Sequence, residues 1–206
     1  MLQIPPKLNR FRLPNRSRRQ LPFPATPSLR IAQLGDPAIH FEAVQVFPCA
    51  RWNHLQWFRP SVLVGSICDL QRLAELSQRR SLDLSSVDHA IFAVTRCGEQ
   101  PVTDIARVVL WQAFGVPVYE LFVSPQGALL ASECEAHEGW HVEQSAKFLS
   151  INGELLVDVP GRPATPTGLS GVLETDACPC GRPGTRLMNV EPLALIRVRR
   201  ALAATA

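Results

Sequence analysis

The sequence of 206 residues has few cysteines for its length and no long apolar run. Six cysteines are too few for a disulfide framework, and close Cys and His spacing in such a chain favours metal ligation. No apolar run reaches the roughly 18 residues that a membrane span requires, and the N-terminus lacks the continuous apolar stretch of a secretory signal. We therefore expect a cytoplasmic protein without a membrane segment.

Acidic residues are missing from residues 1–30, which hold six prolines and seven basic residues: Lys7, Arg10, Arg12, Arg16, Arg18, Arg19 and Arg30. Proline removes backbone donors and the like charges repel one another, so this segment is expected to form a flexible basic arm. The whole chain carries a net charge of only +3, and the rest of it shows no basic stripe. This charge distribution argues against nucleic acid as the main partner.

Residues 31–124 have the pattern of an α/β subdomain. Short apolar strands are predicted at 61–66, 90–95 and 116–123, and amphipathic helices at 68–79 and 104–114. Thr103 is placed to cap the second helix, and Gly115 is placed to end it. Strands that alternate with helices form a parallel sheet with right-handed crossovers, and ligands bind at the carboxyl ends of such strands. Arg96 and Glu99 follow the second strand there, although charged loop residues of this kind are more often solvated.

Residues 125–206 change to short alternating segments, which predict an antiparallel β subdomain. Asn152-Gly153 separates two such segments and is the dipeptide that a type I′ hairpin turn prefers. The fold class predicted for the chain is therefore α/β, with a partial parallel sheet and flanking helices followed by a small antiparallel region.

Four residues of this antiparallel region form a candidate zinc site: Cys134, His141, Cys178 and Cys180. Three thiolates and one imidazole fill a tetrahedral Zn²⁺ site without a vacancy, which favours a structural over a catalytic metal. Pro179 stiffens the link between Cys178 and Cys180, and Gly181 allows the backbone to turn sharply. Spacing alone leaves His137 as a rival to His141. The other cysteines (Cys49, Cys68 and Cys97) are expected to pack as small apolar residues, and the acidic cluster beside the site (Glu133, Glu135 and Glu138) to lie on the surface.

The sequence around these residues resembles the adenylation core of phenylacetate-CoA ligases and the related coenzyme F390 synthetase-like proteins. The matching segments, in the same order and spacing, are 114–122 (FGVPVYELF), 133–134 (EC), 139–143 (GWHVE) and 178–182 (CPCGR). Residues 60–75 also resemble the strand and helix that precede this core, so the resemblance covers about residues 59–188. It implies an acyl-adenylating fold with a structural zinc, and it favours His141 over His137 as the fourth ligand.

Such ligases use ATP and Mg²⁺ to adenylate a carboxylic acid and then transfer the acyl group to coenzyme A, but several of the groups responsible are replaced here. Residues 31–59 hold no run like the family's Ser/Thr/Gly-rich phosphate loop, whose backbone donors cradle the triphosphate. Gln126 occupies the position of the family's Mg²⁺-binding acid, and Gly168 falls near that of its ribose-binding Asp. The chain also ends at Ala206 without the small domain that carries the family's catalytic lysine.

We therefore interpret the chain as a non-catalytic relative that uses its zinc-held scaffold for binding, with a protein or a full-length ligase as its partner. An active or split acid-CoA ligase completed by another chain is the alternative. A nucleic-acid-binding protein that uses residues 1–30 is the second alternative.

Overall fold

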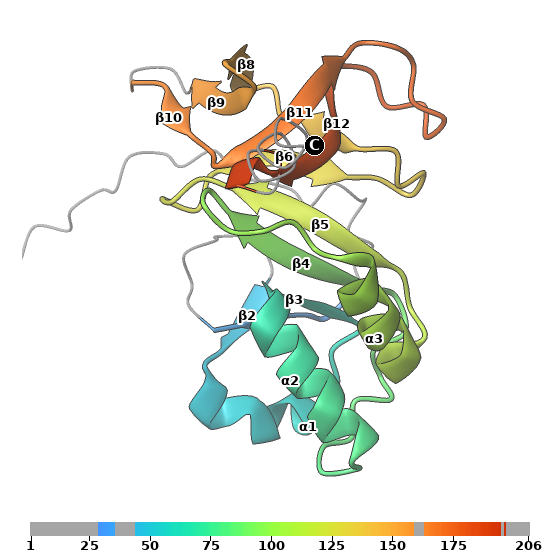
Figure 1. Cartoon of the computed structure of the whole chain (residues 1–206). Helices are drawn as coiled ribbons and strands as arrows, with labels where there is room; N and C mark the ends of the chain where they lie inside the picture. Colours follow the sequence, from blue (N-terminus) through green and yellow to red (C-terminus); the bar gives the residue numbers. More distant parts are fainter. Residues whose placement is uncertain (1–28, 36–43, 159–162, 195, 197–206) are drawn as a thin grey trace, which may run out of the picture.

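The computed structural model describes residues 29–35, 44–158, 163–194 and 196 (Figure 1). Apart from its last two residues, the predicted basic arm at 1–30 lies outside the described part of the chain. No helix among the described residues combines the length and the apolar character needed to cross a membrane.

Within the described residues, one large sheet contains both the parallel and the antiparallel strands. Its nine strands lie in the spatial order β11 (Leu169–Glu174), β12 (Arg186–Pro192), β7 (Trp140–Val142), β6 (Leu129–Glu133), β5 (Val118–Val123), β4 (Ala90–Arg96), β3 (Val62–Ser66), β1 (Ile31–Leu34) and β2 (Val44–Phe47). The strands from β5 to β2 are parallel, as predicted, and those from β5 to β11 pair antiparallel. The predicted α/β class is confirmed, and β5 joins the two kinds of pairing.

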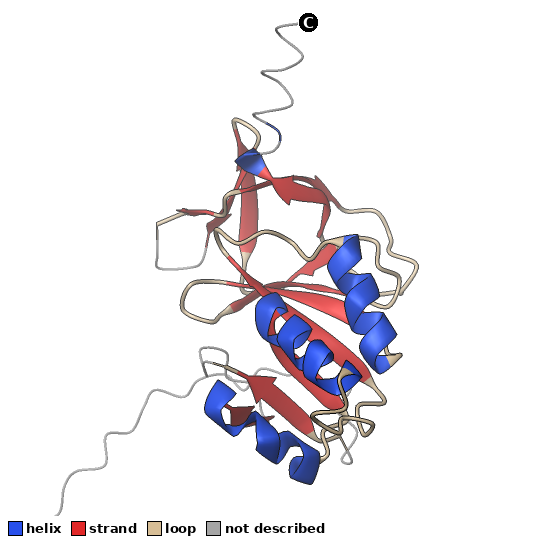
Figure 2. Cartoon of the chain, turned by 60° about the horizontal axis from the view of Figure 1, so that its bottom comes forward, coloured by secondary structure: helices blue, strands red, loops and turns tan. Residues whose placement is uncertain are grey.

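Helices α2 (Ile67–Gln78) and α3 (Asp104–Phe114) cover one face of the parallel strands, with η1 (Cys49–His54) and α1 (Leu55–Phe58) beside them (Figure 2). Each of the two longer helices starts at a capping hydroxyl. Ser66 Oγ accepts a hydrogen bond from Asp69 N at 3.2 Å, and Thr103 Oγ1 accepts one from Ala106 N at 3.3 Å. Gly115 ends α3 with a φ of 68°, as its position in the sequence predicts.

The core under these helices is apolar and contains residues of the sheet, of η1 and of the three α-helices. Its fully buried members include Leu55 of α1, Leu70 and Leu73 of α2, and Leu110 of α3. Burial of a leucine side chain contributes about 1.5–3 kcal/mol, so this layer holds the helices on the sheet.

A second sheet has the order β10 (Thr165–Pro166), β9 (Glu154–Asp158) and β8 (Lys147–Ile151). The predicted hairpin turn is confirmed, because Asn152 and Gly153 have φ of 53° and 82°, the positive values that a type I′ turn requires. Phe148 and Leu155 of this small sheet pack with Phe122 of β5, which places it against the antiparallel half of the large sheet.

Two sequence predictions are wrong in this structure. Cys49 and Cys68 are exposed, not packed in the core. Glu133 is 5% exposed and so does not lie on the surface, whereas Glu135 and Glu138 do. The division into subdomains at 31–124 and 125–206 stays a prediction.

Candidate metal centre

The four predicted ligands come from three places on the antiparallel half of the sheet. Cys134 directly follows β6, His141 lies in the middle of β7, and Cys178 and Cys180 lie in the connection from β11 to β12. Strand pairing aligns them, because His141 is the partner of Ser132 on β6 and of Arg186 on β12. The connection from β6 to β7 and the connection from β11 to β12 thus flank β7, and the cysteine sulfurs that they carry lie close to His141.

Local backbone geometry turns the three sulfurs toward one point. Gly181 has a φ of 78°, and its N–H donates to the Cys178 carbonyl at 2.9 Å, which closes the turn around Pro179. The N–H of Arg182 donates to the Cys180 sulfur at 3.4 Å, and the N–H of Ala136 donates to the Cys134 sulfur. These bonds hold the sulfurs of Cys134 and Cys180 in place.

The distances in this cluster fit a tetrahedral zinc ion. All four ligand atoms lie within 4.8 Å of one another. The sulfurs of Cys134 and Cys178 are 3.7 Å apart, and the Cys180 sulfur lies 3.4 Å from His141 Nε2. A tetrahedral ion with Zn–S of about 2.3 Å and Zn–N of about 2.0 Å requires S···S of about 3.8 Å and S···N of about 3.5 Å. The donor set and its spacing thus fit zinc.

Burial and nearby charges also suit a metal. Burial is the main cause that raises the pKa of Cys134 to about 12, so this thiol stays protonated without a cation beside it. Burial acts in the same direction on Cys178, but hydrogen bonds from Cys180 and Cys134 and the Arg186 charge outweigh it and lower the pKa of Cys178. The pKa of His141 is lowered by burial and by Arg182 and Arg186, which keeps its imidazole neutral.

Two arginines flank the cluster. Arg186 is buried, and its guanidinium also contacts the Glu138 carbonyl at 3.0 Å and the Glu138 carboxylate at 3.4 Å. Arg182 reaches the Ser132 hydroxyl at 3.4 Å and Glu143 at 3.9 Å. Three thiolates around a divalent ion leave one excess negative charge, which these two cations offset.

The rival ligand His137 lies outside the cluster. Its ring stacks on Tyr119 with 5.1 Å between centroids, and its Nδ1 lies 3.0 Å from a Glu133 carboxylate oxygen. His141 instead directs Nε2 at Cys180, while its Nδ1 is buried without a hydrogen-bond partner among the described residues. A metal bound at Nε2 would place the ring proton on Nδ1, so the geometry assigns Nε2 as the ligand atom of this ring.

At the carboxyl ends of the parallel strands, where the sequence suggested a ligand crevice, the ends of β1, β3 and β4 line a small cavity of about 160 Å³ with Arg96 on its wall. These strand ends hold no metal-ligand cluster in the described part of the chain. Arg96 and Glu99 pair with each other at 3.8 Å, and Glu99 also accepts the Arg96 N–H at 2.8 Å. Gln126 is exposed in the turn after β5. Gly168 has a φ of 72°, and its N–H donates a hydrogen bond to a carboxylate oxygen of Glu154 at 3.3 Å. These residues satisfy one another or face solvent.

Sequence reasoning missed a buried ion-pair network between α3 and the sheet. The guanidinium nitrogens of Arg107 on α3 lie 2.9 Å from a carboxylate oxygen of Glu133 on β6 and 3.4 Å from one of Glu120 on β5. The Glu120 side chain is 1% exposed. Glu120 also accepts hydrogen bonds from the Thr95 hydroxyl and the Val102 N–H. Burial raises the pKa of Glu120 to about 7. The sequence did offer one indication of this network, because Glu120 occupies an inward position of a strand whose other inward residues are apolar.

Comparison with known proteins identifies the fold. No family model and no curated protein matches the sequence. Solved structures of acid-CoA ligases do match it: 2-hydroxyisobutyryl-CoA ligase in complex with 2-HIB-AMP and CoA is 15% identical with a TM-score of 0.59, over 79% of this chain and 43% of that one. The fold is that of part of an acyl-adenylating ligase.

Two further ligases give the same result. Coronafacic acid ligase from Pectobacterium brasiliense is 12% identical with a TM-score of 0.55, over 84% of this chain and 41% of that one. The anthranilate CoA ligase AuaEII in complex with anthranoyl-AMP is 11% identical with a TM-score of 0.52, over 77% and 40%. The chain spans less than half the length of these ligases. Likeness at this identity concerns the fold, and it agrees with the acyl-adenylating part of the sequence resemblance.

Proposed function

We propose that the chain is a non-catalytic relative of phenylacetate-CoA ligase-type enzymes, in which Cys134, His141, Cys178 and Cys180 hold a structural Zn²⁺. The retained scaffold serves for binding, as an accessory protein to a protein partner or to a full-length ligase. The observation that carries the proposal is the convergence of three sulfurs and one imidazole within 4.8 Å, on a ligase-like sheet.

The metal would act on structure and not on chemistry. Four protein ligands complete a tetrahedral shell and leave no position for a reactive water. The described ligands are buried or half-buried, so substrate has little access to the ion. What the ion supplies is a link between the end of β6, β7 and the connection from β11 to β12.

The absence of catalysis is supported by two positions that the family resemblance marks. Gln126 offers a neutral amide where those enzymes place an acid that helps hold Mg²⁺, and a hard divalent cation prefers a carboxylate. Gly168 has no side chain that could accept a hydrogen bond from a ribose hydroxyl. Both nucleotide contacts would be lost together.

The direct test is ATP–pyrophosphate exchange with the purified, metal-loaded protein and a panel of aromatic and aliphatic carboxylic acids. We expect no exchange above that of a sample without acid. The variant Gln126→Glu restores the acidic group at this exposed turn. It should still not give exchange, because position 168 lacks a side chain that could accept a hydrogen bond from the ribose. Acid-dependent exchange by the wild-type protein would refute the non-catalytic assignment and leave the metal site untouched.

The alternative is a split acid-CoA ligase completed by another chain. It is supported by the sheet topology, which the chain shares with part of 2-hydroxyisobutyryl-CoA ligase. This alternative predicts that a co-purifying polypeptide restores acid-dependent exchange and acyl-CoA formation when it is added to the purified chain. The accessory role predicts that such a partner has the same activity without this chain.

A further inference from the structure

A groove of about 710 Å³ lies between α3 and the strands β5, β6, β7 and β12. Its volume falls within the range of about 300–1,000 Å³ that small-molecule sites occupy. Two indole rings line it, those of Trp111 on α3 and Trp140 on β7, together with the aliphatic side chains of Val108, Leu187 and Val190. None of these residues belongs to the candidate metal centre, so the groove is a separate feature of the molecule.

The polar groups of the groove carry an excess of negative charge. Three carboxylates line it, those of Asp104, Glu120 and Glu133, whereas Arg107 is the one arginine or lysine among the lining residues that the structure describes. The Arg107 guanidinium lies 2.9 Å from Glu133 and 3.4 Å from Glu120, so two buried carboxylates share a single cation. Burial raises the pKa of Glu120 to about 7. Even when Glu120 is protonated, Arg107 balances only Glu133.

Asp104 supplies the negative charge that remains. It is the first residue of α3, and its side chain is exposed at the groove. The Asp104 carboxylate has no hydrogen bond or ion pair with another residue in the described part of the chain. A bound cation could therefore pair with this carboxylate without breaking a contact inside the protein.

We propose that the groove binds a small organic cation, an ammonium compound with an apolar body. The body lies against the walls that carry Trp111 and Trp140, and the cationic group lies at the Asp104 end. Indole rings attract a cation as well as burying apolar surface, and a carboxylate forms a charge-assisted hydrogen bond with an ammonium group. An anionic ligand would face repulsion from Asp104, and the Arg107 guanidinium is already shared by two carboxylates. The groove therefore selects its ligand by charge.

The test is isothermal titration calorimetry of the purified full chain at pH 8 with three probes. The probes share a phenyl ring on a short chain and differ in charge: 2-phenylethylammonium, 2-phenylethanol and 3-phenylpropanoate. The ammonium probe is expected to bind with a dissociation constant at or below about 1 mM, as a ligand of few atoms does. It should bind at least about tenfold more tightly than the alcohol or the carboxylate, because only its charge is complementary to the groove.

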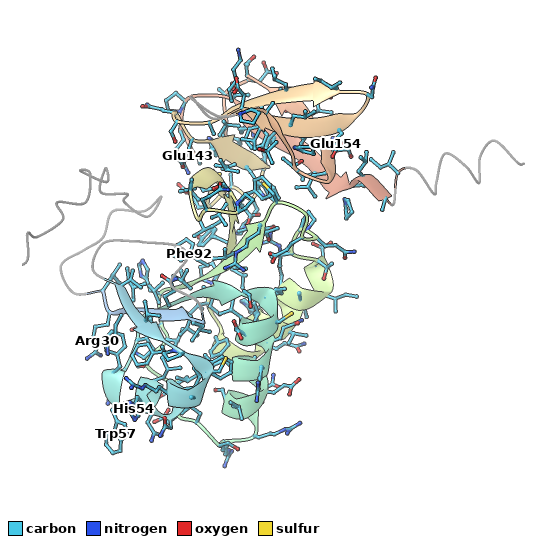
Figure 3. All side chains as sticks on the ribbon, turned by 90° about the vertical axis from the view of Figure 1, so that its left-hand side faces the viewer. Arg30, His54, Trp57, Phe92, Glu143 and Glu154 are labelled. Carbon is cyan, nitrogen blue, oxygen red and sulfur yellow. The ribbon has the colours of Figure 1, made fainter. Side chains whose placement is uncertain are left out.

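Two variants separate the effect of charge from that of apolar contact. Asp104→Asn should raise the dissociation constant of the ammonium probe about threefold or more and leave that of the alcohol unchanged. Trp111→Ala should weaken the binding of both probes. Asp88→Asn and Trp57→Ala are the matched controls and should bind like the wild type. Asp88 is exposed outside the groove, and Trp57 is 80% exposed on α1 and projects from the molecule in Figure 3.

Three results would overturn this assignment. The first is the absence of binding of all three probes at millimolar concentration, and the second is binding of the alcohol or the carboxylate as tightly as the ammonium probe. The third is an affinity for the ammonium probe that Asp104→Asn leaves unchanged or lowers no more than Asp88→Asn does. None of these results bears on the metal centre or on ATP–pyrophosphate exchange.

Discussion

Removal of the metal is expected to destabilise the protein by an amount that follows from the chain length between its ligands. Cys134 and Cys178 are 44 positions apart in the sequence. A cross-link that closes a loop of this length lowers the entropy of the unfolded chain, which stabilises the folded state by about 4 kcal/mol at 25 °C. For a chain of this size that free energy corresponds to a fall in melting temperature of about 8–16 °C.

The assay combines metal content with thermal unfolding. Mass spectrometry of protein expressed without added zinc should find one zinc per chain, and a strong chelator should lower the melting temperature by the amount above. Cys178→Ser should show the same lower melting temperature without chelator, since one ligand is lost while the size of the side chain hardly changes. Cys68→Ser is the matched control, because Cys68 is exposed on α2, and it should keep both the zinc and the melting temperature.

Two results would refute this reasoning. One is a chain that contains no zinc and melts at the same temperature with and without chelator. The other is a melting temperature that falls equally in Cys68→Ser and Cys178→Ser, because the effect would then come from cysteine replacement in general. If complete loss of zinc lowered the melting temperature by only about 1 °C, the unfolded chain would already be restrained without the metal, so that the cross-link would remove little of its entropy.

Two further predictions concern the sheet. Burial raises the pKa of Glu120 from its ordinary value of 4.5 to about 7, so the folded protein keeps a proton that the unfolded chain releases. The free energy of unfolding should therefore fall by about 3 kcal/mol as the pH rises from about 4.5 to 7. Glu120→Gln should remove that fall in denaturant unfolding at several pH values, and a variant with the same pH dependence as the wild type would contradict this prediction. Gly139 has a φ of 80° and a Cβ there would lie 2.5 Å from the Leu187 carbonyl oxygen, whereas Gly153 has a φ of 82° with nothing within 4 Å. Gly139→Ala should therefore cost at least about 2 kcal/mol more than Gly153→Ala in the same measurement, and equal costs would show that β12 moves aside.

The elements with strong local signals were predictable from sequence. Helices α2 and α3 have apolar residues at helical spacing after a capping hydroxyl, and Gly115 ends α3. The Asn152-Gly153 turn has its own backbone requirement. The four residues of the Cys and His cluster could be singled out for a different reason, and their role as metal ligands stays a prediction. Cys and His at short spacings within each pair leave few chemical alternatives, although the distance between the two pairs could not be read from the sequence.

Tertiary contacts account for what sequence reasoning missed. Strand β12 carries Asn189 and Glu191 among its apolar residues, and it is a strand because β7 and β11 offer pairing on both sides. Glu133 has the sequence environment of a surface residue, with Glu135 and Glu138 nearby. Its burial depends on Arg107, which is 26 positions away and reaches it only after α3 has packed on the sheet.

Residues 133 and 134 connect the two stabilising arrangements. Glu133 accepts hydrogen bonds from Arg107 of α3 and from the Glu120 N–H of β5, and the next residue, Cys134, is a ligand of the candidate metal centre. The end of β6 is thus fixed on one side by the ion pair that holds α3 and on the other by the cluster that holds the connection from β11 to β12. Because a buried ion pair contributes specificity more reliably than stability, we expect Arg107 to set the position of β6 and the metal to supply most of the free energy that keeps it there. The antiparallel half of the sheet would then depend on the metal, while the parallel half under α2, which has its own apolar core, would not.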